Sequence, residues 1–241
     1  MTAHARSITG YFDHTFLLNL PDRPDRLRAT MQQLNSLDST AAARVHVFAG
    51  IRSADAHGFP SLGAYGCFQG HLGMLRAARA LGARNVLLLE DDLQFPRSAQ
   101  QNWPAVADEL RSADWGIVNL GFDESSVVAT AAPPQLVRVH GPLMLAHCYA
   151  VNGYALTPLI DFLETLQTRE EGDPRGGPMH YDGALFHFCD QHLQFARYRS
   201  YHSLAGQRSS QSDIAGPRWF DRNPLTRRVV AGLRSASNRL R

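Results

Sequence analysis

Residues 85–92 read Asn-Val-Leu-Leu-Leu-Glu-Asp-Asp (NVLLLEDD), an uninterrupted apolar run that ends in three carboxylates. A short run of Val and Leu bounded by polar residues is typical of a buried β-strand. In an open α/β sheet, ligands bind in the crevice at the carboxyl ends of the strands. The segment therefore predicts a strand at residues 85–89, followed by a ligand site at Glu90, Asp91 and Asp92.

Strand-like and helix-like patterns alternate along the rest of the chain. Short apolar or β-branched runs predict strands at residues 15–20, 44–49, 115–120 and 148–156. Apolar residues at helical spacing predict helices at residues 25–34, 64–80, 103–110 and 159–166. This alternation predicts an α/β architecture in which helices flank a sheet.

The composition argues against several classes of protein. The chain has 241 residues, of which 44% are hydrophobic and 19% charged, enough for one large domain with a sizeable core. No stretch approaches the ~18 apolar residues of a membrane-spanning helix, and residues 1–10 lack the apolar centre of a signal peptide. Three widely spaced cysteines indicate a reducing compartment. We therefore expect a cytoplasmic protein, and the net charge of +2 argues against nucleic-acid binding.

The last segment, residues 215–241, is predicted to be a basic amphipathic tail. It holds seven arginines against a single acid, Asp221, and its Leu225, Val229 and Leu233 fall near one stripe of a helix. Each Arg near an anionic membrane surface contributes about 1 kcal/mol of attraction. This favours peripheral contact with the inner face of a membrane. The alternatives are a helix docked on its own domain and a frayed terminus.

The acidic triplet has a chemistry of its own. Side chains alternate along a strand, so Glu90 and Asp92 are expected on one side and Asp91 on the other. Two carboxylates on one side could bracket Mg²⁺ or Mn²⁺, and such an ion would neutralise a diphosphate and stabilise it as a leaving group. The alternative is a solvated turn in which an Asp caps the next helix.

Three stretches of the chain resemble motifs of the glycosyltransferase family 25 enzymes. They are residues 18–26 (LNLPDRPDR), residues 63–72 (GAYGCFQGHL) and residues 88–92 (LLEDD). The first is similar to the opening strand and turn of that family, the second to its Gly-Cys…Ser-His-Leu helix start, and the third to its Glu-Asp-Asp metal motif. The resemblance runs in the right order from about residue 14 to residue 214.

The resemblance implies a nucleotide-diphospho-sugar transferase fold of the GT-A type, a single domain with a Rossmann-like mixed sheet, here placed at residues 1–214. It also implies a metal-dependent, inverting transfer of a hexose, galactose or glucose, from a UDP-sugar. The expected acceptor is a hydroxyl of a surface glycan, such as a lipopolysaccharide, or of its lipid-linked precursor. The chain departs from the family at Ala64, where the family has Glu, and at Gly70, where it has Ser.

The first two motifs supply residues for donor binding. Asn19 follows the first strand and can hydrogen-bond a base or ribose, whereas Arg26 can pair with a phosphate or merely form a surface ion pair. Gly66, near the predicted helix start, permits close approach to a phosphate. His71 is either a ligand-site residue or a satisfied core histidine. The expected set of donor-binding residues is Asn19, Leu20, Arg26, Gly66, His71 and Asp91.

An inverting transfer also needs a general base beside the acceptor hydroxyl. Asp182 is our candidate, because it follows a Gly- and Pro-rich loop at residues 168–178 that could close over the donor. It is equally well placed to cap a helix. Asp123 and Glu124 are the reserve candidates. His202 is expected to complete the divalent metal site with Glu90 and Asp92.

Two functions other than glycosyl transfer can also be weighed from the sequence. The residues Ala64 and Gly70, in place of polar family residues, suggest a degenerate module that binds a nucleotide sugar or glycan without turnover. A nucleotidyltransferase is disfavoured, because the chain has neither a lysine nor a GxxxxGK[ST] phosphate loop.

Overall fold

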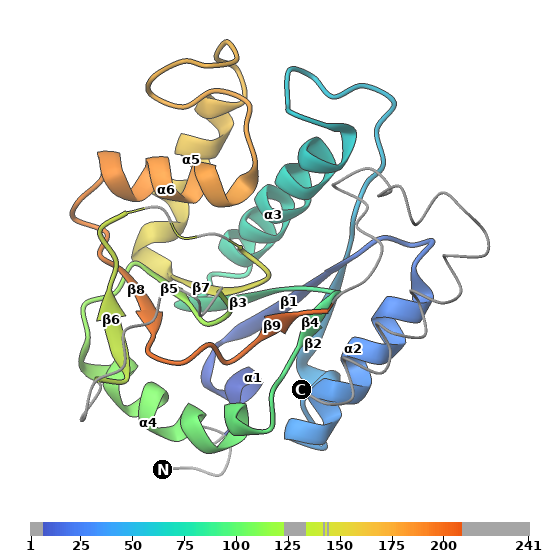
Figure 1. Cartoon of the computed structure of the whole chain (residues 1–241), viewed down its shortest axis with the longest axis vertical. Coiled ribbons are helices and arrows are strands. Elements are labelled where there is room, and N and C mark those ends of the chain that lie inside the picture. Colours follow the sequence, from blue (N-terminus) through green and yellow to red (C-terminus); the bar gives the residue numbers. More distant parts are fainter. Residues whose placement is uncertain (1–6, 123–133, 142, 144, 209–241) are drawn as a thin grey trace.

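The computed structural model describes residues 7–122, 134–141, 143 and 145–208. Its centre is a seven-stranded sheet with strand order β2-β1-β3-β7-β5-β8-β6 (Figure 1). The strands are β1 (His14–Asn19), β2 (Val45–Ala49), β3 (Asn85–Glu90), β5 (Ile117–Asn119), β6 (Leu136–Arg138), β7 (Cys148–Asn152) and β8 (Arg197–Ser200). Strand β1 is parallel to β2 and β3, whereas β7 is antiparallel to β3 and β5. The sheet is therefore mixed.

Helices cover both faces of this sheet, which gives three layers (Figure 1). One face carries α3 (Leu62–Ala80), α5 (Gly153–Leu166) and α6 (Tyr181–Gln191), and the other carries α1 (Ile8–Tyr11), α2 (Pro24–Leu37) and α4 (Ser98–Ser112). A short antiparallel pair, β4 (Leu93–Gln94) with β9 (Gly206–Gln207), lies beside the main sheet. A 3-10 turn, Ala42–Arg44, precedes β2.

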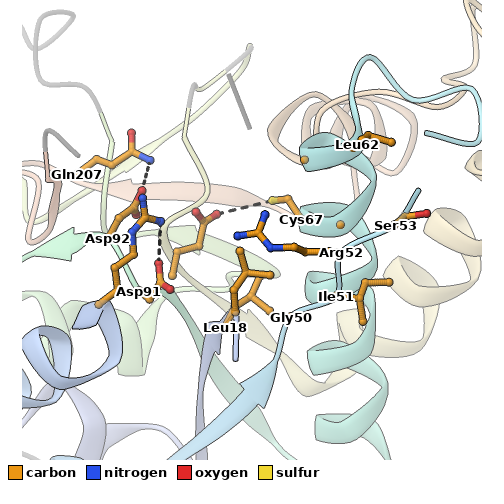
Figure 2. A pocket seen from close by; sticks show the side chains of 15 residues that line it. Leu18, Gly50, Ile51, Arg52, Ser53, Leu62, Cys67, Asp91, Asp92 and Gln207 are labelled. Carbon is orange, nitrogen blue, oxygen red and sulfur yellow. Dashed lines mark hydrogen bonds and ion pairs between the residues drawn. The ribbon is translucent and has the colours of Figure 1, made fainter. Parts of the chain in front are cut away.

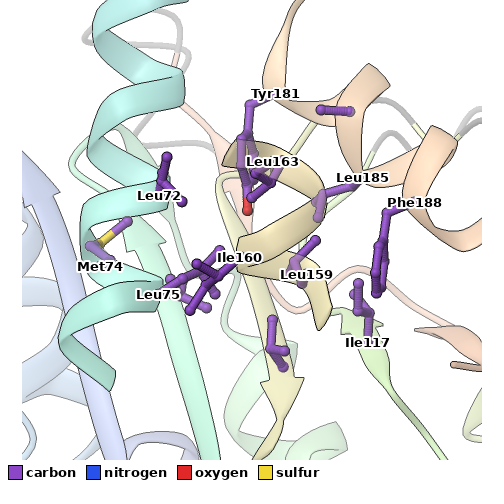
Figure 3. Packing of buried hydrophobic residues seen from close by; sticks show 14 of the residues in the cluster. Leu72, Met74, Leu75, Ile117, Leu159, Ile160, Leu163, Tyr181, Leu185 and Phe188 are labelled. Atoms are coloured by element: carbon purple, nitrogen blue, oxygen red, sulfur yellow. The ribbon is translucent and has the colours of Figure 1, made fainter. Parts of the chain in front are cut away.

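Strand β3 explains why its sequence is apolar without a break. Val86 and Leu88 belong to the hydrophobic cluster under α3, α5 and α6, while Leu87 and Leu89 belong to the cluster under α2 and α4. A strand covered on both faces has no solvent side for polar residues to occupy. Figure 3 shows the first of these clusters, where Leu159 of α5 packs among residues of α3 and α6.

The expected α/β class, with a mixed sheet flanked by helices, is confirmed. The strand expected at residues 148–156 is wrong in its second half, because β7 ends at Asn152 and α5 begins at Gly153. The backbone N–H of Gly153 donates to the carbonyl of Arg84 at 2.7 Å, which redirects the chain into the helix. The helix expected at residues 64–80 begins earlier, at Leu62, because the Ser61 hydroxyl caps it by accepting from the backbone N–H of Ala64.

The expected tail at residues 215–241 lies outside the described residues, so the boundary at residue 214 stays a prediction. In the part of the chain that the structure describes, no helix is both long and apolar enough to span a membrane.

An ion pair between Asp13 and Arg84 links the residues directly before β1 and β3. The Asp13 carboxylate accepts hydrogen bonds from the backbone N–H of Arg84 at 3.0 Å and from its guanidinium at 2.8 and 2.9 Å. The side-chain hydrogen bond from Arg84 is the largest influence on the pKa of Asp13 and lowers it.

We expect Asp13→Asn to lower the free energy of unfolding at pH 7 by about 0.5–1 kcal/mol, because exposed pairs contribute little. The pKa of Asp13 is lower in the folded chain, so the stabilisation is present above its unfolded value and is lost as the pH falls through the folded value. Urea denaturation at pH 7 and pH 3 measures the difference. The stabilising role of the Asp13–Arg84 ion pair is contradicted if Asp13→Asn destabilises the chain equally at pH 7 and pH 3. An equal loss of stability in the exposed control Asp190→Asn would also contradict it.

Candidate functional site

A cavity of about 300 Å³ opens at one edge of the sheet, where the parallel strands β1, β2 and β3 all end (Figure 2). The strand ends, the first turns of α3 and the β9 strand all contribute side chains to it. The lining residues are Leu18, Leu20, Arg26, Gly50, Ile51, Arg52, Ser53, Leu62, Gly63, Gly66, Cys67, Glu90, Asp91, Asp92 and Gln207. Glu90 at the end of β3, and Asp91 and Asp92 directly after it, therefore all line this cavity.

Asp91 is the most firmly held of the three carboxylates. It accepts a hydrogen bond from Asn19 Nδ2 at 2.6 Å and pairs with Arg26 Nη1 at 3.3 Å. Burial raises the pKa of Asp91, and the contacts with Asn19 and Arg26 offset this only in part. Its backbone carbonyl also accepts from Thr30 Oγ1 and from the Arg208 guanidinium. Asp91 thus joins the end of β3 to the end of β1 and to the first half of α2.

Glu90 points to the other side, toward α3. Its Oε1 lies 3.0 Å from His71 Nε2 and 4.0 Å from the Cys67 sulfur. Burial acts to raise the pKa of Glu90, but the hydrogen bond from His71 and the charges of His71, His147 and Arg26 outweigh it, so the pKa is lowered. Glu90 is therefore a carboxylate in the folded protein. Burial and the charge of Glu90 raise the pKa of the Cys67 thiol well above its usual value, so the thiol keeps its proton.

His71 is fully buried and belongs to a chain of hydrogen bonds. Its Nδ1 lies 3.2 Å from Tyr149 Oη, which lies 2.7 Å from Tyr181 Oη. The His71 ring also stacks on the Tyr181 ring, with centroids 4.1 Å apart and planes 11° apart. These contacts fix the orientation of the imidazole beside Glu90.

Asp92 is the least satisfied of the three. Its Oδ2 accepts from Gln207 Nε2 at 2.9 Å, but its buried Oδ1 has no hydrogen-bond partner among the residues that the structure describes. Burial and the negative charges of Glu90 and Asp91 raise the pKa of Asp92 to about 7, against the opposing charge of Arg26. A carboxylate in this state would gain from a cation, and the oxygens of Glu90 and Asp92 are ligands that Mg²⁺ and Mn²⁺ accept. The residues present therefore fit a divalent ion.

Of the residues expected to bind the donor, four line the cavity: Leu20, Arg26, Gly66 and Asp91. Asn19 and His71 do not contribute to its lining; they are buried behind it and hold Asp91 and Glu90 in place. A direct contact of Asn19 or His71 with the donor stays a prediction.

The structure does not bring the expected base or the expected histidine ligand into the lining. Asp182 lies in the first turn of α6, where its two oxygens accept from the backbone N–H groups of Leu145 at 3.2 Å and Gly183 at 2.9 Å. His202 is exposed and lies edge-on to the Tyr201 ring. Asp123 and Glu124 fall outside the described residues.

Several lining residues were missed from the sequence. The segment at residues 50–53 follows β2, and its place at the same edge as Glu90 follows from β2 being a parallel neighbour of β1. That signal was available in the predicted strand at residues 44–49. Gln207 reaches the site through the pairing of β9 with β4, for which the local sequence carries no signal.

Gly66 lines the cavity for a reason of packing. A Cβ at this position would lie 2.7 Å from the backbone carbonyl oxygen of Ile51, so the absence of a side chain lets residues 50–53 lie against α3. We expect Gly66→Ala to destabilise the fold by about 1–3 kcal/mol through this overlap, although Ala favours a helix over Gly by about 1 kcal/mol.

Thermal unfolding of the Gly66→Ala variant measures this cost. Gly141→Ala is the control, because nothing lies within 4 Å of the Cβ that it would add. Equal melting temperatures for the two variants would show that residues 50–53 yield without cost.

Comparisons with known proteins give one weak relative. No family model matches the chain. The chain is 28% identical over 166 residues to procollagen galactosyltransferase 1 of the zebrafish Danio rerio, a match that covers 61% of this chain and 27% of the relative. This weak homology agrees with the resemblance to glycosyltransferase family 25, and the chain spans about a quarter of the length of that relative.

Two solved structures are similar in part. One is a mannose-1-phosphate geranyltransferase from Thermus thermophilus, with a TM-score of 0.44 and 15% identity over 78% of this chain and 73% of that one. The other is a glycosyltransferase involved in the glycosylation of the major capsid of PBCV-1, with a TM-score of 0.42 and 12% identity over 83% and 94% of the two chains.

Proposed function

We propose that the chain is a metal-dependent, inverting glycosyltransferase that moves a hexose, galactose or glucose, from a UDP-sugar to a hydroxyl of a saccharide or glycolipid. The observation that carries this proposal is Asp92, whose buried Oδ1 lacks a hydrogen-bond partner within the described residues and which shares the cavity with Glu90. The weak homology to a galactosyltransferase supports the same reaction class.

In this proposal Glu90 and Asp92 hold Mg²⁺ or Mn²⁺, which supplies charge neutralisation for a diphosphate leaving group. The chain adds positive potential of its own. The first turn of α3, capped by Ser61, faces the cavity through Leu62 and Gly63, and helix N-termini favour phosphate. The Arg52 side chain, which pairs with Asp22 at 3.0 Å, lines the cavity from the wall opposite Asp91 and Asp92 (Figure 2).

Asp182 remains the proposed base, with Asp123 and Glu124 in reserve. It lies in the first turn of α6, which packs on the same face of the sheet as α3. Its two oxygens accept from the backbone N–H groups of Leu145 and Gly183, and these contacts fix the orientation of its carboxyl group.

A binding module without turnover is the second candidate, and the departures at Ala64 and Gly70 were its motive. Ala64 is buried in the apolar core, and a Cβ at Gly70 would lie 2.6 Å from the Leu18 side chain. Neither residue lines the cavity in the described part of the chain. Both departures therefore have a packing explanation, which favours the enzyme.

We further propose a cytoplasmic location, supported by the three widely spaced cysteines. The arginine-rich residues 215–241 support peripheral contact with an anionic membrane surface.

The test is product formation from UDP-galactose and UDP-glucose with Mn²⁺ and a panel of saccharide acceptors. Acceptor-dependent release of UDP, with inversion at the anomeric carbon of the product by NMR, is the expected result. Donor binding without any acceptor-dependent turnover favours the binding module instead. Retention at the anomeric carbon would remove the role proposed for a base.

A further inference from the structure

Three potential metal-binding side chains meet on the α3 side of the cavity. One ligand atom each from Cys67, His71 and Glu90 lies within 4.8 Å of the other two. Cys67 and His71 are four residues apart on α3, and residues at this spacing are neighbours on one helix face. Glu90 comes from the end of β3, so a helix and a strand fix the group together.

Two of the three ligand separations are close to those of a tetrahedral zinc site. Bond lengths of about 2.0–2.1 Å to nitrogen or oxygen and about 2.3 Å to sulfur separate tetrahedral ligands by roughly 3.3–3.6 Å. The His71 Nε2 to Glu90 Oε1 distance is 3.0 Å, and the Cys67 sulfur to Glu90 Oε1 distance is 4.0 Å. Changes of about half an ångström would bring these two pairs to such separations. The remaining pair, Cys67 and His71, has its ligand atoms within 4.8 Å of each other, so Cys67 has the largest adjustment to make.

The surroundings of His71 also match those of a metal ligand. A ligating histidine almost always donates its second ring N–H to an outer partner, which fixes the tautomer. Here Nδ1 of His71 lies 3.2 Å from Tyr149 Oη, and Tyr149 in turn contacts Tyr181. With Nε2 on the ion, the Nδ1–H donates to Tyr149.

We propose that Cys67, His71 and Glu90 form a site for a thiophilic divalent cation, with Zn²⁺ as the representative ion. The donor set of sulfur, nitrogen and oxygen suits Zn²⁺, whereas Mg²⁺ prefers oxygen ligands alone. The Cys67 thiol releases one proton on coordination, because the thiolate is the ligand. Cys67 and Glu90 both line the cavity, so the fourth position of the ion faces it and is open to water.

The site shares one residue with the proposed donor-metal site. An ion held by Cys67, His71 and Glu90 occupies the carboxylate that Glu90 would offer beside Asp92. Zn²⁺ bound here therefore competes with Mn²⁺ for Glu90. The proposal itself does not depend on glycosyl transfer, because Zn²⁺ binding can be measured without any sugar donor.

Co²⁺ titration tests the site directly, since Co²⁺ replaces Zn²⁺ and gives a near-ultraviolet charge-transfer band when a thiolate binds it. We expect one Co²⁺ per chain with this band, and displacement of Co²⁺ by Zn²⁺. Cys67→Ser should remove the band and weaken Zn²⁺ binding by at least about 100-fold, more than the ~10–100-fold cost of losing an outer partner. Cys189→Ser is the matched control, because Cys189 is also a half-buried free cysteine, and it should leave both unchanged.

No band in the folded wild-type chain, or a band that survives Cys67→Ser, overturns the proposal. If Cys67→Ser fails to fold, the wild-type chain still decides the matter through alkylation of Cys67 followed by mass spectrometry. Zn²⁺ should slow that alkylation at least about tenfold without slowing alkylation of Cys189, whereas an unchanged rate overturns the site. If UDP and Mn²⁺ fail to bind while the Co²⁺ band is present, the proposed function fails and the zinc site stands.

Discussion

Replacing Asp92 by asparagine should lower kcat/KM for metal-dependent transfer by about 10³-fold or more while the fold survives. A bound metal ion contributes several kcal/mol to the stabilisation of a developing charge, and each 1.4 kcal/mol is a factor of ten in rate. Asp92 contributes little to holding the fold, because its Oδ2 contacts Gln207 and its Oδ1 has no partner in the described residues. Kinetics with UDP-galactose or UDP-glucose at saturating Mn²⁺ measure the loss.

Although Asp92→Asn should lose activity, we expect it to be at least as stable as the wild type when no metal is bound. The pKa of Asp92 is raised to about 7 by burial and by Glu90, above its ordinary value near 4, so the folded chain holds a proton that the unfolded chain has lost. In the metal-free protein, protonated Asp92 makes its full contribution to the free energy of unfolding only at low pH. That contribution is lost as the pH rises toward 7. Asp92→Asn removes that loss, so with EDTA at pH 8 the variant should melt no lower than the wild type.

Asp108→Asn is the control for both measurements, since Asp108 lies on α4, on the opposite face of the sheet from α3. Unchanged kcat/KM in Asp92→Asn would remove its metal role. A large fall in the melting temperature of that variant would mean that Asp92 holds the fold instead.

The neighbouring replacement, Asp91→Ala, should act mainly on stability, with a loss of about 3–5 kcal/mol. Removing one partner of a buried ion pair leaves the other uncompensated. Here the loss leaves the Arg26 guanidinium and the Asn19 amide without their carboxylate. At about 2–4 °C per kcal/mol for a chain of this size, the melting temperature should fall by roughly 10 °C.

Asp91→Asn refines this prediction. The amide keeps an acceptor oxygen for one of the two contacts, so its loss should be smaller than that of Asp91→Ala. Thermal and urea unfolding of both variants measure the difference. If Asp91→Ala is as stable as the wild type, the contacts of Asp91 with Asn19 of β1 and Arg26 of α2 do not hold the fold as described.

The sequence patterns predicted the elements that the structure buries between its layers. Strand β3 and helix α3 were predicted because long apolar or helical periodicity is a local property, and in the structure both are covered by neighbouring layers. Strands β6 and β8 were not predicted, because they are short, and Arg138, Arg197 and Arg199 interrupt their apolar pattern. Their pairing depends on partners far along the chain, which no local window reports.

The candidate site, like the fold, could be predicted from the sequence only in part. Strand alternation predicted that Glu90 and Asp91 face opposite sides, and the structure has Glu90 toward α3 and Asp91 toward α2. The sequence order that suggested His202 as a ligand carried no information about where its loop lies. Cys67 and Gln207 reach the cavity through tertiary packing. Their contribution could not be predicted from the residues beside them.

The most direct test of the donor site is thermal stabilisation by UDP with and without Mn²⁺, with GDP and CDP as controls and Asp92→Asn beside the wild type. A ligand that binds only the folded chain adds about 2.7 kcal/mol at 100 times its Kd, which corresponds to a shift of roughly 5–10 °C. We predict such a shift for UDP with Mn²⁺ in the wild type, little shift with UDP alone, and none that depends on Mn²⁺ in Asp92→Asn. The absence of any Mn²⁺-dependent stabilisation by UDP, GDP or CDP would contradict a nucleotide and metal site at the end of β3.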